Sequence, residues 1–355
     1  MVGLRVVCEG CIVKAAQLYE VGKDLRIVDV PVPEVGPGDV LVRIRASGLC
    51  HSDIHYRDGV SPVGRLPIIL GHEIAGVVER VGAEVDGVKP GDRVCIHYQL
   101  SCGDCIYCTT GREYLCDRGA MIGKHVDGGF AEYISVPARN VLKIPEGIPF
   151  EQAAIIGCAV STPFHALRIA DLRPGEAVAV YGVGGIGIHA VQLASKVFNA
   201  SPVIAIDLVE EKLQLARRLG ADETINAGEV DPVDAISEIT DGRMVDVAVE
   251  AVGLAKTAEQ TVRSVGKAGR SVFIGIGGET IKIQPYTQLI TKEAKILGSS
   301  DHTKQEMQTI LKLVKAGKID LTHSITHWIH LEEINEAMQT LRKNIGNPIR
   351  IVIIQ

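Results

Sequence analysis

The sequence predicts an α/β protein with a β-rich first part and a doubly wound parallel sheet after it. Three observations lead to this fold class. Short strand-like runs with closely spaced turn signals fill residues 1–150, and strand-like and helix-like runs alternate from residue 151 onward. Such alternation is typical of a parallel sheet that helices cover on both faces. The length of 355 residues is enough for two domains of ordinary size.

The β-rich first part is predicted from one alternating run and three turn sequences. Residues 40–46 partly alternate between apolar and polar side chains, which indicates a half-buried strand. Turn sequences that contain proline and glycine, at 37–39, 90–92 and 145–147, indicate several short strands with tight connections.

Two cysteines precede this regular pattern, which begins at Lys14. Cys8 and Cys11 form a lone C-x-x-C, and we interpret them as part of a loosely attached extension. A functional dithiol is the alternative interpretation.

The second part contains the runs expected of the alternating sheet. A helix is predicted over residues 151–170. Four apolar runs predict strands and two amphipathic runs predict helices, at 177–181, 203–206, 245–249 and 271–276 for the strands and at 186–197 and 210–219 for the helices. From about residue 301, helix-like and strand-like segments follow and end in an apolar run over 348–354.

The composition is that of a globular protein and argues against several function classes. Hydrophobic residues make up 46% and charged residues 23% of the chain, and the formal net charge is −6 with no long run of one sign. A phosphate-binding surface needs clustered Lys and Arg, so nucleic acid is not an expected partner. No apolar stretch reaches the roughly 18–20 residues of a membrane span, and residues 1–13 are too interrupted for a signal peptide. We therefore expect a cytoplasmic protein with no membrane partner.

A glycine-rich turn follows the apolar strand at 177–181 and opens the next helix. Its six residues match G-x-G-x-x-G, the dinucleotide-binding pattern: Gly182, Val183, Gly184, Gly185, Ile186 and Gly187. The first glycine allows the tight turn, the second lets the backbone approach a pyrophosphate, and the third lets the helix pack on the strand. The helix N-terminus offers free N–H groups and partial positive charge to the phosphates.

An acidic residue stands where such a turn needs one. Asp207 comes 20 residues after Gly187, at the end of the next predicted strand, and can accept hydrogen bonds from the adenosine ribose hydroxyls. Its carboxylate would repel a 2′-phosphate, and Leu208 offers no compensating cation, which favours NAD over NADP. The alternative is an ordinary glycine-rich turn with a solvated aspartate.

Five of the nine cysteines lie between Cys95 and Cys116. Cytosolic thiols usually stay reduced, so such a cluster indicates a metal site or catalysis before disulfides. Four of the five can enclose one tetrahedral zinc ion without an open position, as in a structural site: Cys102, Cys105, Cys108 and Cys116. An iron–sulfur loop and disulfides are the alternatives, but in ferredoxin-type loops the fourth cysteine follows after three residues and precedes proline.

Several motifs occur together in the order known from one enzyme family. Residues 71–76 (Gly-His-Glu-Ile-Ala-Gly), followed by Gly82 and Val85, match a zinc signature, and residues 50–55 and 157–162 are similar to two further ligand segments. From about residue 14 to its end, the chain resembles the zinc-containing medium-chain dehydrogenase/reductase family, in its alcohol dehydrogenase branch. The cysteine cluster and the glycine-rich turn look like the structural zinc lobe and the cofactor-binding turn of that family.

The resemblance implies a GroES-like β-rich catalytic domain beside a Rossmann domain. The catalytic domain would comprise residues 1–155 and 300–355, and the NAD-binding Rossmann domain would comprise residues 156–299. The implied cofactors are NAD and two zinc ions per chain.

The resemblance also implies a catalytic zinc site whose ligands are dispersed in the sequence. Cys50, His72 and Cys158 would hold the metal and leave a fourth position for water or substrate. Glu73 is similar to a nearby carboxylate that ligates transiently, and Asp53 would hold the His72 imidazole in place. Polyol dehydrogenases of the family often have Glu in place of Cys158, so this cysteine favours an alcohol substrate.

The implied reaction is reversible hydride transfer between a primary or secondary alcohol and NAD, which gives an aldehyde or a ketone. Zinc would lower the pKa of the alcohol, and the nicotinamide would take the hydride. Ser52 is similar to the family's relay hydroxyl, and His55 resembles the imidazole that passes the proton to solvent through the cofactor ribose. The structural alternatives are a capping hydroxyl for Ser52 and a surface histidine for His55.

Cofactor contacts outside the glycine-rich turn are implied by position. They fall on six residues of this chain: His51, Thr162, Lys212, Val252, Ile276 and Arg350. His51 and Arg350 would contact the pyrophosphate, Lys212 the ribose, and Thr162 and Ile276 the nicotinamide.

Two other functions are compatible with these residues. One is a polyol or amino-alcohol dehydrogenase, or a carbonyl reductase, because the sequence does not fix the volume of the substrate pocket that Tyr98 is expected to line. The other is a non-catalytic zinc- or nucleotide-binding relative, which should have lost ligand or relay residues that this chain retains. The expected substrates are small-molecule alcohols, aldehydes or ketones, and by analogy we expect a homo-oligomer, with a tetramer favoured.

Overall fold

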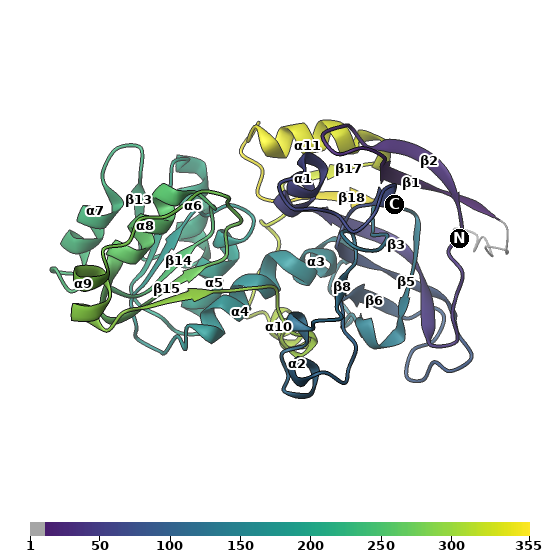
Figure 1. Cartoon of the computed structure of the whole chain (residues 1–355), viewed down its shortest axis with the longest axis horizontal. Helices are drawn as coiled ribbons and strands as arrows, with labels where there is room; N and C mark the ends of the chain where they lie inside the picture. The colour runs from purple at the N-terminus through teal and green to yellow at the C-terminus, as the bar shows by residue number, and fades with distance from the viewer. Residues whose placement is uncertain (1–10) are drawn as a thin grey trace. The chain divides into compact units, whose positions relative to one another are not determined.

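The structure is a computed structural model that describes residues 11–355 of the chain (Figure 1). It divides into two compact units, which we call the first and the second unit. Among the described residues, the first unit comprises residues 11–157, Ile325–Ile345 and Arg350–Gln355, and the second comprises Cys158–Ser324 and Gly346–Ile349. The expectation about Cys8 lies outside the described residues.

Strands form the framework of the first unit. In chain order they are β1 (Ile12–Leu18), β2 (Arg26–Pro31), β3 (Asp39–Leu49), β4 (Ile68–Ile69), β5 (Glu73–Val81), β6 (Arg93–Ile96), β7 (Gln99–Leu100), β8 (Ala120–Met121), β9 (Tyr133–Pro137), β10 (Val141–Lys143), β17 (His327–Ile329) and β18 (Ile351–Ile354). The largest sheet has the order β10-β6-β5-β3-β18-β17, and β9 also pairs with β3. A smaller sheet has the order β2-β1-β4, and β7 pairs with β8.

The pairing of the central strand β3 with β5 helps to explain why the sequence of β3 alternates only in part between apolar and polar residues. It is longer than the predicted run at 40–46, and its register with β5 shifts at two places. The first shift places an extra residue in β5, and the second places one in β3, Arg45, which interrupts the alternation of β3 there. The end of β3 brings Gly48 opposite Glu73 of β5, and Leu49 opposite Ile351 of β18.

Short helices complete the first unit. They are α1 (His51–Asp58), α2 (Ile106–Thr109), α3 (Phe150–Ile155) and α11 (Ile334–Arg342), with the 3-10 turns η1 (Glu113–Leu115), η2 (Ala138–Asn140) and η5 (Leu331–Glu333). Cys11, where the described residues begin, packs beside a buried cluster that includes Val13, Leu41 and Tyr133. The chain is therefore attached to the first unit from Cys11 onward.

The second unit is built on a parallel sheet with the order β13-β12-β11-β14-β15-β16. The strands are β11 (Val178–Tyr181), β12 (Val203–Asp207), β13 (Glu223–Asn226), β14 (Val245–Glu250), β15 (Val265–Phe273) and β16 (Lys295–Gly298). This is the doubly wound order of dinucleotide-binding folds, and it confirms the predicted fold class. The sequence analysis does not predict β13 and β16. Both are edge strands with few buried side chains, so neither has an apolar run.

Helices alternate with these strands. They are η3 (Ile156–Val160), α4 (Ser161–Ile169), α5 (Gly187–Lys196), α6 (Glu210–Leu219), α7 (Pro232–Ile239), α8 (Ala255–Ser264), α9 (Pro285–Gln288), η4 (Ile290–Lys292) and α10 (Lys304–Lys315). Over residues 11–355, the structure contains no helix that is both long enough and apolar enough to span a membrane.

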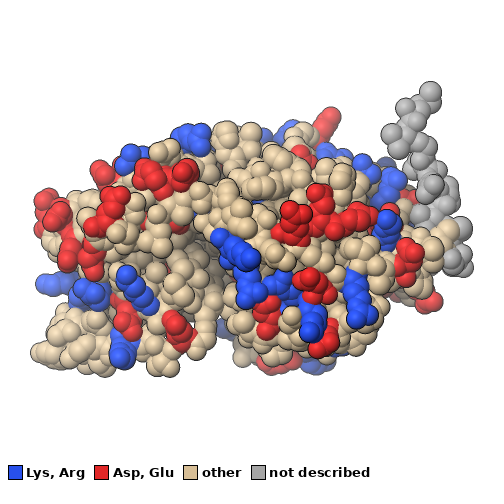
Figure 2. Space-filling model, turned by 90° about the horizontal axis from the view of Figure 1, so that it is seen from above, with Lys and Arg blue, Asp and Glu red and all other residues tan. Residues whose placement is uncertain are grey.

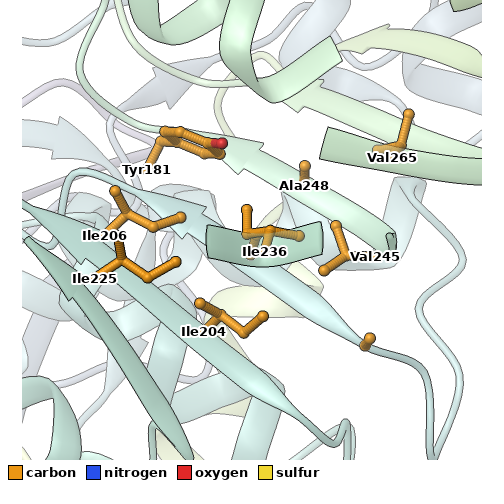
Figure 3. Packing of buried hydrophobic residues seen from close by; sticks show 10 residues of the cluster. Tyr181, Ile204, Ile206, Ile225, Ile236, Val245, Ala248 and Val265 are labelled. Atoms are coloured by element: carbon orange, nitrogen blue, oxygen red, sulfur yellow. The ribbon is translucent and has the colours of Figure 1, made fainter. Parts of the chain in front are cut away.

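The core of the second unit lies on both faces of its sheet, because side chains alternate along each strand. Ala179 and Tyr181 of β11 belong to a buried cluster with Ile236 of α7 (Figure 3). Val180 points to the opposite face, where α5 begins: a Cβ added to Gly187 would lie 3.4 Å from Val180 Cγ1. Helices therefore cover both faces of the sheet.

The predicted helix over 151–170 is divided into α3, the π-helical turn η3 and α4. Pro163 has no N–H to donate to the carbonyl of Ala159, so regular α-helical bonding cannot run through this segment. The π-helical turn contains Cys158, and the boundary between the two units falls between Gly157 and Cys158.

Residues 301–324 lie in the second unit, which differs from the expected division at residue 300. α10 packs against α4. The carboxylate of Glu306 lies 3.0 Å from His165 Nδ1 and 2.8 Å from Arg168 Nη1. A buried carboxylate between two basic side chains of α4 holds this segment to the second unit.

Candidate functional site

Four buried side chains from separate segments converge in the structure. The candidate ligand atoms of Cys50, His72, Glu73 and Cys158 all lie within 4.8 Å of one another. Cys50 stands between β3 and α1, His72 and Glu73 stand at the start of β5, and Cys158 lies in η3. A Cβ added to the preceding Gly157 would lie 3.7 Å from Glu73 Cα, so the helical segment that carries Cys158 lies against the start of β5.

The buried carboxylate of Asp53 joins the segments that carry two of these side chains. Its Oδ2 accepts a hydrogen bond from the backbone N–H of Cys50 at 2.9 Å, and its Oδ1 accepts one from the backbone N–H of Gly71 at 3.2 Å. The same Oδ1 lies 3.3 Å from His72 Nδ1. Asp53 therefore positions Cys50 and His72 together, as a carboxylate behind a metal-binding imidazole does.

His72 is fully buried, and its ring meets Tyr98 edge-on with 5.1 Å between the ring centroids. Burial lowers the pKa of His72, but the charges and hydrogen bonds of Asp53 and Cys50 together outweigh burial and raise that pKa well above its usual value. The Nε2 atom is buried and has no hydrogen-bond partner in the part of the chain that the structure describes. A site that favours positive charge, with an imidazole nitrogen beside two thiols, fits a metal cation.

Glu73 forms a buried ion pair with Arg350, which immediately precedes β18. Arg350 Nη2 lies 2.5 Å from Glu73 Oε1. Burial raises the pKa of Glu73 to about 7, although the charge of Arg350 acts in the opposite direction. A Cβ at Gly48 would lie 2.0 Å from Glu73 Oε2, so the carboxylate fits only because residue 48 is glycine. The sequence analysis did not identify this pair, although a single arginine within the apolar run at 348–354 is a signal for one.

The predicted relay residues lie on α1, next to the four-residue group. Ser52 is half-buried, and its Oγ lies 3.6 Å from Cys50 Sγ. His55 is half-buried and His51 is exposed, with 6.4 Å between their ring centroids. Residues four positions apart share one face of a helix, so both imidazoles lie on the same side of α1.

The clustered cysteines form a lobe that β7 and β8 close at its base. Four separations between their Sγ atoms are 3.4, 3.5, 3.8 and 3.8 Å. A tetrahedron with Zn–S bonds of about 2.3 Å has edges of about 3.8 Å, so the arrangement of Cys102, Cys105, Cys108 and Cys116 fits one zinc ion. All four are free thiols rather than disulfides. The hydrogen bond from the backbone of Cys108 lowers the pKa of Cys105 to about 6, which favours the thiolate that zinc binds.

The glycine-rich turn lies between β11 and α5, as predicted. Gly182 has φ of +83°, which favours glycine, and a Cβ at Gly187 would lie 1.8 Å from the carbonyl oxygen of Gly182. A Cβ at Gly184 would meet no described atom within 4 Å, so the backbone is open to close approach there. The remaining residues of the turn are Val183, Gly185 and Ile186.

Asp207 ends β12 beside this turn. Its Oδ2 accepts a hydrogen bond from the backbone N–H of Val183 at 2.8 Å, and its Oδ1 accepts one from that of Leu208 at 2.8 Å. The Leu208 side chain is 68% exposed and brings no positive charge to the carboxylate. Burial lowers the pKa of Lys212, while the charge of Asp207 acts in the opposite direction.

The other predicted contact residues occupy different surroundings. Thr162 is buried, and its Oγ1 lies 3.7 Å from Cys158 Sγ. Val252 and Ile276 follow β14 and β15 and have exposed side chains. Tyr98 is buried against His72.

Charged side chains are mixed on the protein surface. On the face shown in Figure 2, Lys and Arg side chains lie among Asp and Glu side chains.

Two family models match the chain. The model for the alcohol dehydrogenase GroES-like domain matches residues 36–146, and the model for zinc-binding dehydrogenases matches residues 185–316. The first match contains the cysteine lobe and three of the four converging side chains. The second begins within the glycine-rich turn, at Gly185, and contains Asp207.

Similar proteins match over nearly their whole length. An alcohol dehydrogenase of Geobacillus stearothermophilus is 41% identical, and the match covers 93% of this chain and 96% of the relative. An NAD-dependent alcohol dehydrogenase of Sulfurisphaera tokodaii is 37% identical, over 95% of this chain and 99% of the relative. The crystal structure of the alcohol dehydrogenase of Aeropyrum pernix superposes with a TM-score of 0.89 at 37% identity, and covers 96% of this chain and 100% of that one. Two further solved structures, with TM-scores of 0.88 and 0.90 at 32% and 27% identity, contain NADP and NADH respectively.

Proposed function

The chain belongs to the zinc-containing medium-chain dehydrogenase/reductase family, in its alcohol dehydrogenase branch, and from this premise we propose that it is a zinc-dependent alcohol dehydrogenase. It transfers hydride reversibly between a primary or secondary alcohol and NAD, and gives an aldehyde or a ketone. The observation that carries this function is the convergence of Cys50, His72, Glu73 and Cys158 in one buried group.

We assign the catalytic zinc to Cys50, His72 and Cys158, with Glu73 as the nearby carboxylate. Three protein ligands leave the fourth tetrahedral position for water or substrate, which is the arrangement of catalytic sites. The structural zinc is assigned to Cys102, Cys105, Cys108 and Cys116, which provide four ligands and leave no open position.

When bound, zinc supplies the Lewis acid that makes the alcohol hydroxyl acidic, and NAD accepts the hydride. The residues of the chain move the proton and fix the geometry. Ser52, whose Oγ lies 3.6 Å from the Cys50 thiol, would accept the hydroxyl proton of the substrate while its own hydroxyl proton passes on along the relay. His55, which is half-buried and lies on the same side of α1 as the exposed His51, passes the proton to solvent. Asp53 keeps the His72 ring in its orientation.

We propose that NAD is preferred to NADP. Asp207 is held beside the glycine-rich turn by backbone hydrogen bonds, where its carboxylate can accept hydrogen bonds from the ribose hydroxyls. The same charge would repel a 2′-phosphate. In this assignment Gly182–Gly187 contact the pyrophosphate together with His51 and Arg350, and Lys212 contacts the ribose. Thr162, Val252 and Ile276 lie at the nicotinamide.

We also infer a cytoplasmic homo-oligomer, with a tetramer favoured. A free-thiol zinc lobe persists in reducing compartments. β16 is an edge strand, and the segment before it exposes Tyr286 and Ile290 at 63% and 65%. An edge strand with exposed apolar neighbours can pair with a second copy. Light scattering after size exclusion measures the subunit number.

The experiment that tests the proposed function combines zinc analysis with NAD-linked oxidation of a broad set of alcohols and polyols. We expect turnover of simple primary or secondary alcohols by protein that contains zinc, and loss of turnover after chelation with recovery on adding zinc. Turnover restricted to polyols or amino alcohols would assign the chain to another activity of the family. Absence of turnover with every substrate would contradict the proposal.

A further inference from the structure

Glu250, a residue that the sequence analysis did not select, is a buried carboxylate at the carboxyl end of β14. Its Oε1 accepts hydrogen bonds from the backbone N–H groups of Val252 and Gly253 at 3.0 and 2.9 Å. The same oxygen accepts one from Thr257 Oγ1 at 2.7 Å. Three donors on one oxygen hold the turn over residues 251–254 to the end of β14, because a buried carboxylate needs hydrogen-bond donors that the turn supplies.

Three glycines connect this turn to the loop that follows β15. A Cβ at Gly253 would lie 2.3 Å from the carbonyl oxygen of Ile276, and a Cβ at Gly277 would lie 2.0 Å from the carbonyl oxygen of Gly253. A Cβ at Gly275 would lie 2.4 Å from Glu250 Oε2. The two backbone segments are therefore in direct contact, and the Glu250 carboxylate lies against both of them.

These fixed backbones present two exposed apolar side chains, Val252 and Ile276. Their exposed fractions are 42% and 46%. The side chain of Val252 lies over the first glycine of the glycine-rich turn, since a Cβ at Gly182 would lie 2.4 Å from Val252 Cγ2. An exposed apolar wall next to that turn is suited to cover part of a bound dinucleotide.

The strand order shows which half of the dinucleotide this wall covers. β12, with Asp207 at its end, pairs with one side of β11, and β14 and β15 follow on the other side. In the proposed function, the pyrophosphate binds after β11 and the adenosine ribose binds at Asp207. The other half of the dinucleotide must then extend over the ends of β14 and β15.

We propose that Glu250 is a positioning residue for the nicotinamide half of the cofactor. It acts through the turn over 251–254 and the loop over 275–277, and it does not contact the hydride itself. This inference rests on the proposed function.

Binding of two ligands to the zinc-loaded enzyme tests the inference: NADH, and ADP-ribose, which lacks the nicotinamide. In Glu250→Ala, the backbone donors of Val252 and Gly253 lose their acceptor. We expect the Kd for NADH to rise by roughly tenfold or more, while the Kd for ADP-ribose stays within about twofold of wild type. Glu250→Gln keeps one acceptor oxygen and should restore most of the NADH affinity.

Two more variants keep the test decisive. Thr257→Val removes one of the donors without emptying the carboxylate site, so it should fold and should weaken NADH binding to a smaller extent with ADP-ribose unchanged. Ser271→Ala removes a buried hydrogen bond of 3.2 Å from the neighbouring strand and should leave both affinities unchanged. Equal weakening of NADH and ADP-ribose, or unchanged NADH binding in both Glu250→Ala and Thr257→Val, would overturn the inference. Wild-type protein that binds neither ligand would instead contradict the proposed function.

Discussion

The guanidinium of Arg350 lies 2.5 Å from the carboxylate of Glu73, although 277 residues separate the two in the chain. The pair ties the last strand of the first unit to the strand that begins with the candidate metal ligands. Both side chains are almost fully buried, so neither charge has water as a substitute partner.

Removal of the arginine should therefore destabilise the protein strongly. Arg350→Met leaves the Glu73 carboxylate buried without its cation, and we expect a loss of about 3 kcal/mol and a clearly lower Tm. The matched control is Arg342→Met, which removes an exposed partner 3.4 Å from Asp58 and should cost less than about 1 kcal/mol. Calorimetry of both zinc-loaded variants measures the difference, and similar small shifts would show that the buried pair contributes little.

Each of the two ligand sets should bind one zinc ion, and the two ions should have different roles, one in catalysis and one in stability. Wild type should contain two zinc ions per chain. His72→Ala should retain one zinc and the fold but lose nearly all turnover. Cys105→Ser should lose the other zinc and melt at a lower temperature, because metal binding energy is partly folding energy in such a lobe. Metal analysis, melting curves and turnover on the same preparations decide the assignment. It is wrong if His72→Ala keeps its turnover and Cys105→Ser keeps its melting temperature.

His55→Gln tests the proton relay. We expect a loss of about 10- to 100-fold in turnover near neutral pH, which lies within or somewhat below the usual range for one proton-transfer group. The loss should become smaller at high pH, where hydroxide can take the proton directly. Turnover of the variant and of the wild type is measured from pH 6 to 10, and the zinc content of both proteins is checked at the lowest and the highest pH. A ratio that does not change with pH would indicate a structural role.

Asp207→Ser tests the choice of cofactor. The wild type should use NAD at least roughly 100-fold better than NADP in kcat/KM, because two charges at close range repel by several kcal/mol even at an effective dielectric near 20. The variant should narrow this gap, mainly through a higher KM for NAD, since the ribose is remote from the hydride. Steady-state kinetics with both cofactors provide the measurement, and equal use of the two by wild type would refute the role of Asp207.

Glu306 should make stability depend on acidity. Burial acts in the opposite direction, but the hydrogen bond to His165, the backbone N–H of Thr303 and the charge of Arg168 together lower the pKa of this carboxyl. A carboxyl with a lowered pKa stabilises the fold above its unfolded value of about 4.5, and that contribution disappears as the pH falls through the folded value.

Glu306→Gln should accordingly lower the stability by about 2 kcal/mol at pH 7. The difference in Tm between the two proteins should stay constant down to about pH 5 and shrink below it. Comparison of the two proteins cancels the pH dependence of metal binding, which both share. A Tm difference that is the same at pH 4 and pH 7 would contradict the assignment.

The sequence predicts local features well and distant pairings poorly. The glycine-rich turn was found because its glycines meet backbone requirements within six residues, and Asp207 because the spacing of strand, helix and strand is regular. Edge strands such as β13 lack apolar runs, so the sequence does not predict them.

For distant pairings of side chains, a local signal does not identify the partner: an arginine within the apolar run at 348–354 indicates a buried ion pair but not which carboxylate completes it. Nothing near Glu73 in the sequence points to Arg350, and nothing near Glu250 shows that its carboxylate would organise two loops. Both depend on strand order, which brings segments together only in the folded chain. The dispersed site could be anticipated only through family resemblance, since Cys50 and Cys158 are far apart in sequence.

The two candidate metal sites also differ in how they can be assembled during folding. In the lobe closed by β7 and β8, the first and last cysteines are 14 residues apart, so a nascent or unfolded chain needs only a short loop closure to gather all four. The dispersed set runs from Cys50 to Cys158 and exists only after β3, β5 and the helical segment around residue 158 have come together. In the proposed assignment, metal acquisition therefore has a built-in order. The cysteine lobe can bind its zinc ion first. A partly folded chain would then contain the structural zinc ion but lack the catalytic one.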